Sequence, residues 1–215
     1  MSAMAAAIVG EKIHLFADAI FYDDDGIVSA IHPKIWKVPG LNASFISRGQ
    51  GRAFPYFQMI VQECGFETWD ELKSGLPEVW ETLDALMDYT PMDIMIAGFS
   101  EKNDRPEVLY RHTVKSNEDG VLAAGNTYIY TEGAFSFGCS IEYAEDICAE
   151  AIRAFERSRN EKCDINGFHA GRRSTFAHAI GGRLQHVELT REGDRGEVLL
   201  VWPDEIGKRI VPLAA

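Results

Sequence analysis

The sequence contains few cysteines, and they lie far apart. Cys64, Cys139, Cys148 and Cys163 are separated by 75, 9 and 15 positions, so the chain has no CxxC pair of the kind that holds zinc. Scattered thiols in a chain of this length are typical of the reducing cytoplasm. We therefore expect a cytoplasmic protein with reduced cysteines, without a metal and without another cofactor.

Long hydrophobic runs and excess positive charge are also missing. No window reaches the roughly 18 apolar residues of a membrane helix. The first residues, from Met1 to Val9, lack the basic region that opens a signal peptide. Lys and Arg number 21 and Asp and Glu number 33, so the formal net charge is 21 − 33 = −12. Because an acidic surface repels phosphate backbones, we expect neither a membrane nor a nucleic acid as a partner.

The composition is that of an ordinary globular protein. The 215 residues are 46% hydrophobic and 25% charged, which excludes a largely disordered chain. The chain carries no internal repeat, no low-complexity run and no segment that reads as a linker. Its length fits one large domain, and we expect a single domain over residues 1–215.

The first part of the chain has the two-residue period of β-strands. Alternate apolar residues such as Ile13, Leu15 and Ala17 predict a strand. The acidic run that ends at Gly26 lacks the alternating ligands and the distal glutamate of a calcium loop, so we expect a hairpin turn there. Strands are predicted over residues 3–9, 12–22, 27–31, 34–38 and 41–47.

Helical periodicity appears in three places. The apolar spacing of residues 54–64 predicts one helix, and a second is expected from Thr68, which forms a capping box with Glu71. Its expected buried stripe is Leu72, Leu76, Val79, Leu83 and Leu86. We expect Gly75 and Pro77 to divide this second helix into two pieces. A third helix is predicted over residues 141–157, capped by Ser140.

The remaining segments again favour strands. Strands are predicted over residues 93–99, 107–114, 121–132, 182–190, 196–202 and 209–213, and residues 135–138 are expected to be a loop. Helices thus arrive in separate blocks between antiparallel hairpins. Such an order predicts an α+β protein with helices stacked against sheets.

This order, together with several short motifs, resembles the proteasome β-subunit and HslV branch of the N-terminal-nucleophile (Ntn) hydrolases. The motifs are Phe16-Ala17-Asp18, Pro33-Lys34-Ile35-Trp36, Ser47-Arg48-Gly49 and Ile180-Gly181-Gly182, in that order along most of the chain. The resemblance implies a four-layer αββα sandwich with two stacked antiparallel sheets. It also implies self-association as a homo-oligomer, in which a ring is one form, and a peptide or amide substrate.

The spacing of three polar residues carries the resemblance further. Sixteen positions separate Ser2 from Asp18, and sixteen separate Asp18 from Lys34, as in the family. The resemblance implies that Ser2 becomes an N-terminal nucleophile once Met1 is removed, with its own α-amine as the base. Lys34, held by Asp18, would stabilise negative charge, and the backbone N–H of Gly49 would receive the oxyanion.

The chain departs from the family at two supporting positions. Ala177 and Ile180 stand where the family has an aspartate and a serine that support the N-terminal residue. Polar side chains nearby that are candidates to replace them are Arg172, Arg173, Ser174 and His178. A retained Met1 would also leave the nitrogen of Ser2 as a non-basic amide. These departures leave two alternative hypotheses. One is a non-catalytic scaffold or binding protein of the same fold, and the other is an unrelated α+β binding protein.

Other candidate sites have a weaker basis. His169, His178 and His186 are spaced by 9 and 8 positions, which fits no compact metal signature. The loop of residues 48–51 lacks the third glycine and the lysine of a phosphate-binding loop. Cys139 has no histidine close to it in the sequence. We expect structural roles for these residues.

Overall fold

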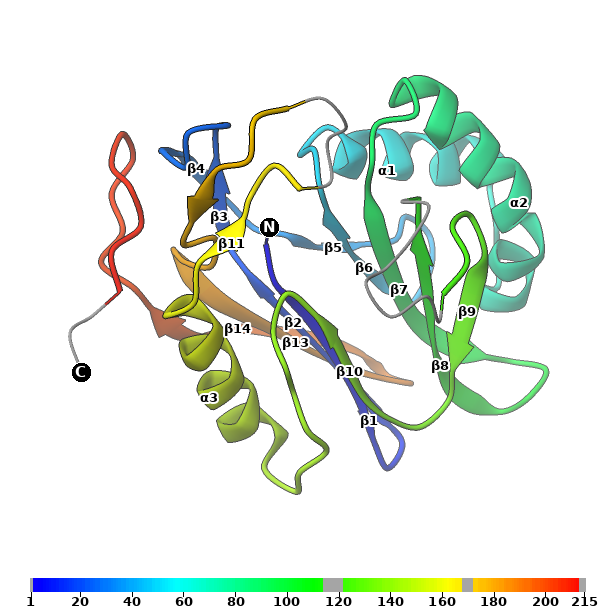
Figure 1. Ribbon diagram of the computed structural model, residues 1–215. Coiled ribbons are helices and arrows are strands. Elements are labelled where there is room, and N and C mark those ends of the chain that lie inside the picture. The colour runs from blue at the N-terminus through cyan, green and yellow to red at the C-terminus, as the bar shows by residue number, and fades with distance from the viewer. Residues whose placement is uncertain (1, 114–121, 168–171, 213–215) are drawn as a thin grey trace.

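The computed structural model describes residues 2–113, 122–167 and 172–212. Its described residues form a mixed α/β protein in which strands far outnumber helices (Figure 1). The helices are α1 (Ala53–Cys64), α2 (Trp69–Leu86) and α3 (Ile147–Arg159). Among the described residues, none of these helices combines the length and the apolar character that crossing a bilayer requires.

The strands form two five-stranded sheets in which all neighbours are antiparallel. The first sheet has the order β10 (Gly133–Phe137), β1 (Met4–Val9), β2 (Lys12–Asp18), β13 (Arg183–Thr190) and β14 (Gly193–Val201). The second has the order β5 (Ile35–Lys37), β6 (Ser44–Arg48), β7 (Asp93–Ser100), β8 (Arg105–His112) and β9 (Thr127–Tyr130). Two short ribbons pair β3 (Ile20–Tyr22) with β4 (Val28–Ile31), and β11 (Cys163–Asp164) with β12 (Phe176–Ala177).

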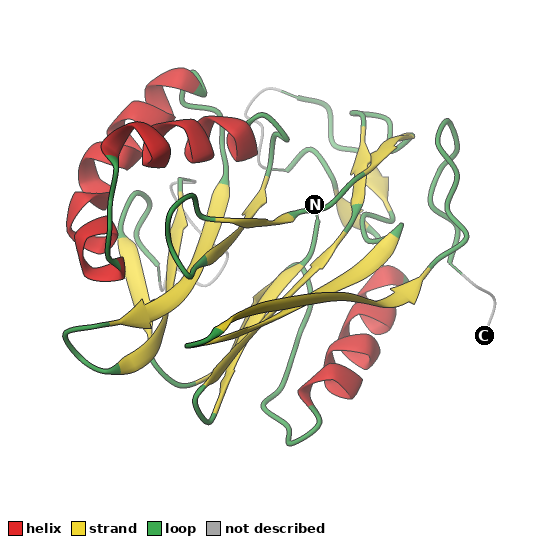
Figure 2. Ribbon diagram, turned by 180° about the vertical axis from the view of Figure 1, so that it is seen from behind, coloured by secondary structure: helices red, strands yellow, loops and turns green. Residues whose placement is uncertain are grey.

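Three large apolar clusters hold the two five-stranded sheets and the helices together. Because successive side chains of a strand point to opposite faces, β2 contributes to two of them. Leu15 packs with Met95 of β7 in a cluster that joins the two sheets. Phe16 packs with Phe155 in a cluster that joins the first sheet to α3. The third cluster joins α1 and α2 to the second sheet, so helices flank the strands on both sides (Figure 2).

Two local signals predicted from the sequence are confirmed. Gly26 has a φ of +78°, the left-handed conformation that the turn between β3 and β4 requires. The capping box of α2 is present, since Thr68 Oγ1 accepts a hydrogen bond from the Glu71 backbone N–H at 3.1 Å and Glu71 bonds back to the N–H of Thr68.

The expected break in the second helix is wrong. Helix α2 continues through Gly75 and Pro77, because its buried face packs in the cluster with α1 and the second sheet. The missing side chain of Gly75 has a packing role instead, since a Cβ there would lie 2.5 Å from the ring of Phe66. Leu86, expected in the buried stripe, is 39% exposed at the end of the helix.

Several other predicted boundaries are corrected. The third helix begins at Ile147 and not near residue 141, with the Asp146 carboxylate and not Ser140 as its cap. The predicted strand over 12–22 is interrupted at Ala19, and residues 135–138, expected as a loop, belong largely to β10. The predicted strand at 209–213 is reduced to an isolated bridge between Ile27 and Arg209 in its described part, and residue 213 lies outside the described residues.

Candidate functional site

A buried ion pair lies at the centre of the site. Asp18 is the last residue of β2 and Lys34 lies just before β5, so the pair connects the two large sheets. Lys34 Nζ lies 2.9 Å from Asp18 Oδ2, and the two side chains are 2% and 0% exposed. The Asp18 carboxylate also accepts hydrogen bonds from the backbone N–H groups of Ala3 at 2.9 Å and Ile20 at 3.2 Å. Its charge is therefore both paired and hydrogen-bonded, as a buried charge requires.

The Lys34 side chain reaches beyond Asp18 to the beginning of the chain. Its Nζ lies 2.7 Å from Ser2 Oγ and 5.0 Å from the centre of the Phe21 ring. Its backbone N–H donates to Gln185 Oε1 at 2.8 Å, which fixes the residue against β13. Burial lowers the pKa of the Lys34 ammonium, and the charge of Asp18 opposes that shift.

Ser2 is held at this point by its backbone neighbours. The N–H of the following residue, Ala3, donates to Asp18, and the Ser2 carbonyl lies 3.5 Å from Arg48 Nη1. Ser2, Asp18 and Lys34, which are sixteen positions apart in the sequence, therefore lie together in the structure. Asp18 contacts both the Lys34 ammonium and the backbone that follows Ser2. Met1, whose removal the family resemblance implies, lies outside the described residues.

Gly49 follows β6 in a conformation that favours glycine. Its φ is +121°, and a Cβ at this position would lie 2.8 Å from the carbonyl oxygen of Pro91. The preceding residue, Arg48, is buried and donates through Nε to Asp93 Oδ2 at 2.7 Å, which ties this loop to β7. Backbone geometry and close packing together exclude a side chain at Gly49.

Ser2 and Gly49 line the same cavity. It has a volume of about 440 Å³ and also includes Arg48, Asp93, Arg52 and Arg172 in its wall. Arg172 forms an ion pair with Asp24, another wall residue. A molecule in the cavity would therefore meet a hydroxyl, a glycine backbone and charged groups of both signs.

The two supporting positions taken from the resemblance are apolar in their surroundings as well as in their side chains. Ala177 packs with Ile165, and Ile180 packs in the cluster between α3 and the first sheet. Of the polar residues considered as replacements, His178 Nδ1 lies 3.0 Å from the carbonyl oxygen of Arg159, and Arg172 pairs with Asp24. His178 thus bonds to the backbone near the end of α3, whereas Arg172 and Asp24 lie in the wall of the cavity that Ser2 also lines.

Sequence reasoning missed the segment after β10. A Cβ on Gly138, whose φ is +76°, would lie 2.6 Å from the Ser2 carbonyl oxygen, so this glycine allows the close approach of two backbone segments. Cys139 comes next, and burial raises the pKa of its thiol to about 12, with the negative charge of Asp18 adding to the shift. A thiol with such a pKa is a poor nucleophile near neutral pH. The pairing of β1 with β10 brings Gly138 and Cys139 close to Ser2, and no local sequence pattern predicts that pairing.

Two of the three histidines singled out in the sequence lie in the described residues. His169 lies outside the described residues, and His178 bonds to the backbone near the end of α3. His186 faces His14, with Nε2 of His186 and Nδ1 of His14 3.0 Å apart. The two residues are 172 positions apart in the chain, so no short sequence motif predicts this contact.

Comparison with known proteins was informative only at the level of structure. No family model and no curated protein matches the chain. Its fold is similar to the solved structure of an Anbu (Gly-1) mutant from Hyphomicrobium sp. strain MC1, with a TM-score of 0.61 and 13% sequence identity. The match covers 95% of this chain and 89% of the Anbu chain.

This likeness corrects the resemblance drawn from the sequence. Assignment to the proteasome β-subunit and HslV branch is wrong as stated, because the matching structure is that of Anbu, an HslV-like, proteasome-related protein, and no family model supports the assignment. A sequence identity of 13% shows a shared fold and does not carry a shared activity. The chain therefore has a mixed α/β fold similar to that of the Anbu structure.

Proposed function

We propose that this protein hydrolyses amide or peptide bonds, with Ser2 Oγ as the nucleophile. One observation supports the proposal above all others: Lys34 Nζ lies 2.7 Å from Ser2 Oγ and 2.9 Å from Asp18 Oδ2. A serine hydroxyl needs a base and a stabilising charge before it attacks a carbonyl carbon. A buried ammonium that contacts both the hydroxyl and a carboxylate is suited to the second of these tasks.

The base in this proposal is the α-amine of Ser2. An unperturbed α-amine has a pKa of roughly 7.7 to 8.0, so near neutral pH a useful fraction is neutral and able to accept the hydroxyl proton. The amine exists only after Met1 has been removed. The Lys34 charge beside it favours the neutral amine and stabilises negative charge on Oγ.

The proposed reaction has two stages, acylation of Ser2 and hydrolysis of the acyl group. Oγ attacks the carbonyl carbon of the substrate while the α-amine takes its proton, and the backbone N–H of Gly49 donates to the resulting oxyanion. The intermediate collapses, the α-ammonium returns the proton to the departing amine, and the acyl group remains on Oγ. Water, deprotonated by the same α-amine, then attacks the acyl carbon. The bond from that carbon to Oγ breaks, the α-ammonium returns its proton to Oγ, and the acid leaves.

The finer description of the fold is part of the same proposal. We infer that the three apolar clusters are the interfaces of a four-layer αββα sandwich made by residues 1–215 as one domain. We also propose a cytoplasmic homo-oligomer, with a ring as the form to be tested. Analytical ultracentrifugation measures the assembly size directly. A monomer at every concentration tested would contradict the proposed homo-oligomer.

A non-catalytic scaffold is the second candidate, and one observation favours it. Ala177 and Ile180 pack among apolar side chains and offer no side-chain hydrogen bond to a terminal amine. Without such support, the amine would be oriented by fewer partners. Under this second hypothesis, Asp18 and Lys34 hold the two sheets together and Ser2 takes no part in a reaction.

Covalent labelling separates the two candidates. A β-lactone probe acylates an activated hydroxyl, and we expect it to label the wild-type protein and not Ser2→Ala. The matched control is Ser29→Ala, because Ser29 lines the same cavity. We expect that control to label like the wild type. Equal labelling of Ser2→Ala and wild type, or no labelling of either, would contradict the proposed nucleophile.

A further inference from the structure

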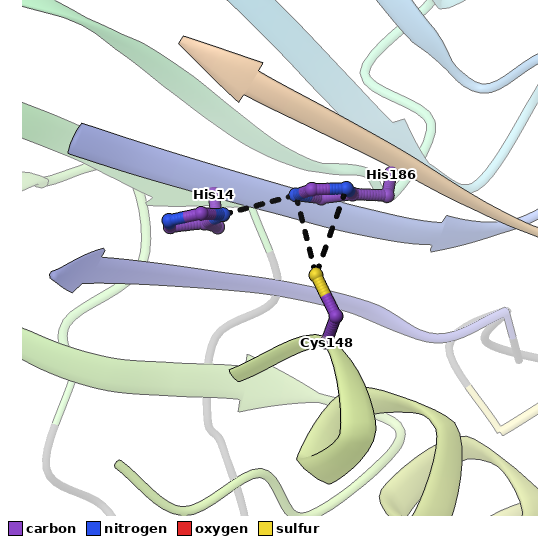
Figure 3. Close-up of side chains that lie close together, drawn as sticks. All are labelled: His14, Cys148 and His186. Atoms are coloured by element: carbon purple, nitrogen blue, oxygen red, sulfur yellow. Dashed lines mark hydrogen bonds between the residues drawn. The ribbon is translucent and has the colours of Figure 1, made fainter. Parts of the chain in front are cut away.

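A second cluster of reactive side chains lies on the face of the first sheet that packs against α3. His14 comes from β2, His186 from the neighbouring β13, and Cys148 is the second residue of α3 (Figure 3). Both histidines are buried, whereas Cys148 is half-buried. None of these residues contributes to the wall of the cavity beside Ser2.

The donor atoms of this cluster are close together. His14 Nδ1 and His186 Nε2 are 3.0 Å apart, and Cys148 Sγ lies 3.8 Å and 3.9 Å from the two ring nitrogens of His186. One donor atom from each of the three residues fits within a span of 4.8 Å. In Figure 3 the sulfur lies next to the His186 ring, with dashed lines to both of its nitrogens, and His14 lies on one side of His186.

A carboxylate determines which nitrogen of His186 is free to bind. His186 Nδ1 lies 3.1 Å from Glu197 Oε1 on the adjacent strand β14, so Nδ1 carries the proton and donates it. Nε2 is then left with a lone pair that points toward His14. Histidines that bind metals ordinarily donate their other ring N–H to a carboxylate or carbonyl in this way.

The surrounding charge favours a cation. Burial raises the pKa of the Cys148 thiol, and the negative charges of Glu197, Asp146 and Glu188 raise it further. Burial lowers the pKa of His14 to about 4, which keeps its imidazole neutral near pH 7. Two neutral imidazoles and a thiol near three carboxylates can accept a divalent cation, whose charge would in turn favour the thiolate.

The spacing is close to that of a tetrahedral site. With Zn–N bonds of about 2.0–2.1 Å and a Zn–S bond of about 2.3 Å, donor atoms in such a site stand roughly 3.3 to 3.6 Å apart. The pair of nitrogens is a few tenths of an ångström closer than this, and Cys148 Sγ is a few tenths farther from His186. The third separation, between the donors of His14 and Cys148, is within 4.8 Å, so the imidazoles and Cys148 must rotate to bring the three lone pairs toward one ion.

We propose that His14, Cys148 and His186 form a binding site for a zinc-class cation, with two imidazole nitrogens and one thiolate as ligands. Nitrogen and sulfur donors of this kind select borderline-soft divalent metals such as zinc over magnesium and calcium. Water completes the coordination. Because the ligands come from α3 and two strands, the ion would fix the beginning of α3 onto the first sheet.

Binding has a definite proton balance. The thiol of Cys148 loses its proton to solvent and binds as the thiolate. His14 moves its proton from Nδ1 to Nε2 and His186 keeps its proton on Nδ1, so the imidazoles release none. One proton is therefore released for each ion bound at a pH below the thiol pKa.

The experiment uses the full chain, freed of metal with a chelator and titrated with Co²⁺ as a spectroscopic substitute for Zn²⁺. We expect one ion per chain and a near-ultraviolet sulfur-to-cobalt charge-transfer band. Zn²⁺ should abolish the band by competition and raise the thermal midpoint of the wild type. A pH indicator should report one proton released per ion.

Matched cysteine variants assign the ligand. Cys148→Ser should lose the charge-transfer band and weaken binding by about 100-fold or more. Cys163→Ser, which changes another half-buried cysteine, should behave like the wild type. His14→Gln should weaken binding as well, with circular dichroism to check that it folds. Absence of the band in the wild type, or an unchanged band in Cys148→Ser, would overturn the proposal and leave a hydrogen-bonded histidine pair.

Discussion

Lys34 Nζ and Asp18 Oδ2 form a 2.9 Å ion pair from which solvent is almost wholly excluded. The pair joins the end of one sheet to the beginning of the other, and Ser2 Oγ lies 2.7 Å from the same ammonium. Structure and proposed chemistry therefore depend on the same contact.

The first prediction concerns stability. Asp18→Asn leaves the Lys34 ammonium buried without a counter-charge, and we expect a loss of about 3–5 kcal/mol in the free energy of unfolding. The control is Glu205→Gln, which removes one partner of the exposed ion pair with Lys208 and should cost less than about 1 kcal/mol. Urea denaturation of both variants measures the difference. Equal costs would mean that the buried charge is tolerated without its partner.

The second prediction concerns the role of the lysine in the reaction. Lys34→Met removes the charge beside Ser2 Oγ while keeping a long apolar side chain, and we expect hydrolysis to fall by about 10²-fold or more. Lys37→Met changes a lysine that is 72% exposed and should leave the rate within a factor of two or so of wild type. Rates are compared with a fluorogenic peptide as the substrate. A Lys34→Met variant that folds and retains the wild-type rate would remove Lys34 from the mechanism.

The third prediction concerns Gly49. Gly49→Ala places a Cβ 2.8 Å from the Pro91 carbonyl oxygen in addition to the strain of a positive φ. Gly10→Ala also has a positive φ, of +60°, but meets nothing within 4 Å, so it measures a left-handed conformation without a clash. We expect Gly49→Ala to be less stable than Gly10→Ala by about 1–3 kcal/mol. Thermal unfolding measures this, and the opposite order would contradict the packing described for the loop.

The fourth prediction concerns pH and the metal-free protein. Burial and the neighbouring His186 lower the pKa of His14 from 6.5 to about 4. Between these values the unfolded chain binds a proton that the folded chain does not, so stability falls as the pH is lowered through this window. After allowance for solvent screening we expect His14 to contribute on the order of 1–2 kcal/mol to this fall. In His14→Gln the slope between pH 6.5 and pH 4 should be shallower, and an unchanged slope would assign it to other groups.

Much of the strand and helix content follows from local patterns in the sequence. The alternation of Ile13, Leu15 and Ala17 predicts β2, and the Thr68–Glu71 capping box predicts where α2 begins. Both signals depend on neighbours within a few positions. Pro77 does not break α2, because packing against the second sheet outweighs the local tendency of proline to end a helix. The local sequence shows that tendency but does not show the packing.

The candidate site was partly predictable for a different reason. The intervals between Ser2, Asp18 and Lys34 are visible in the sequence, and the structure brings these residues within hydrogen-bonding distance. The pairing of β1 with β10 is not visible, because it depends on contacts more than a hundred positions apart. For the same reason, no spacing along the chain announces the cluster of His14, Cys148 and His186.

The most direct test of the proposed function is tandem mass spectrometry of the N-terminal peptide after treatment with an epoxyketone. This reagent offers two electrophilic carbons, so it joins a hydroxyl and an amine only when both belong to the same free N-terminal residue. We predict a peptide that begins at Ser2 and carries one reagent bound through both Oγ and the α-amine. A peptide that still begins at Met1, or a reagent attached elsewhere, would contradict the account.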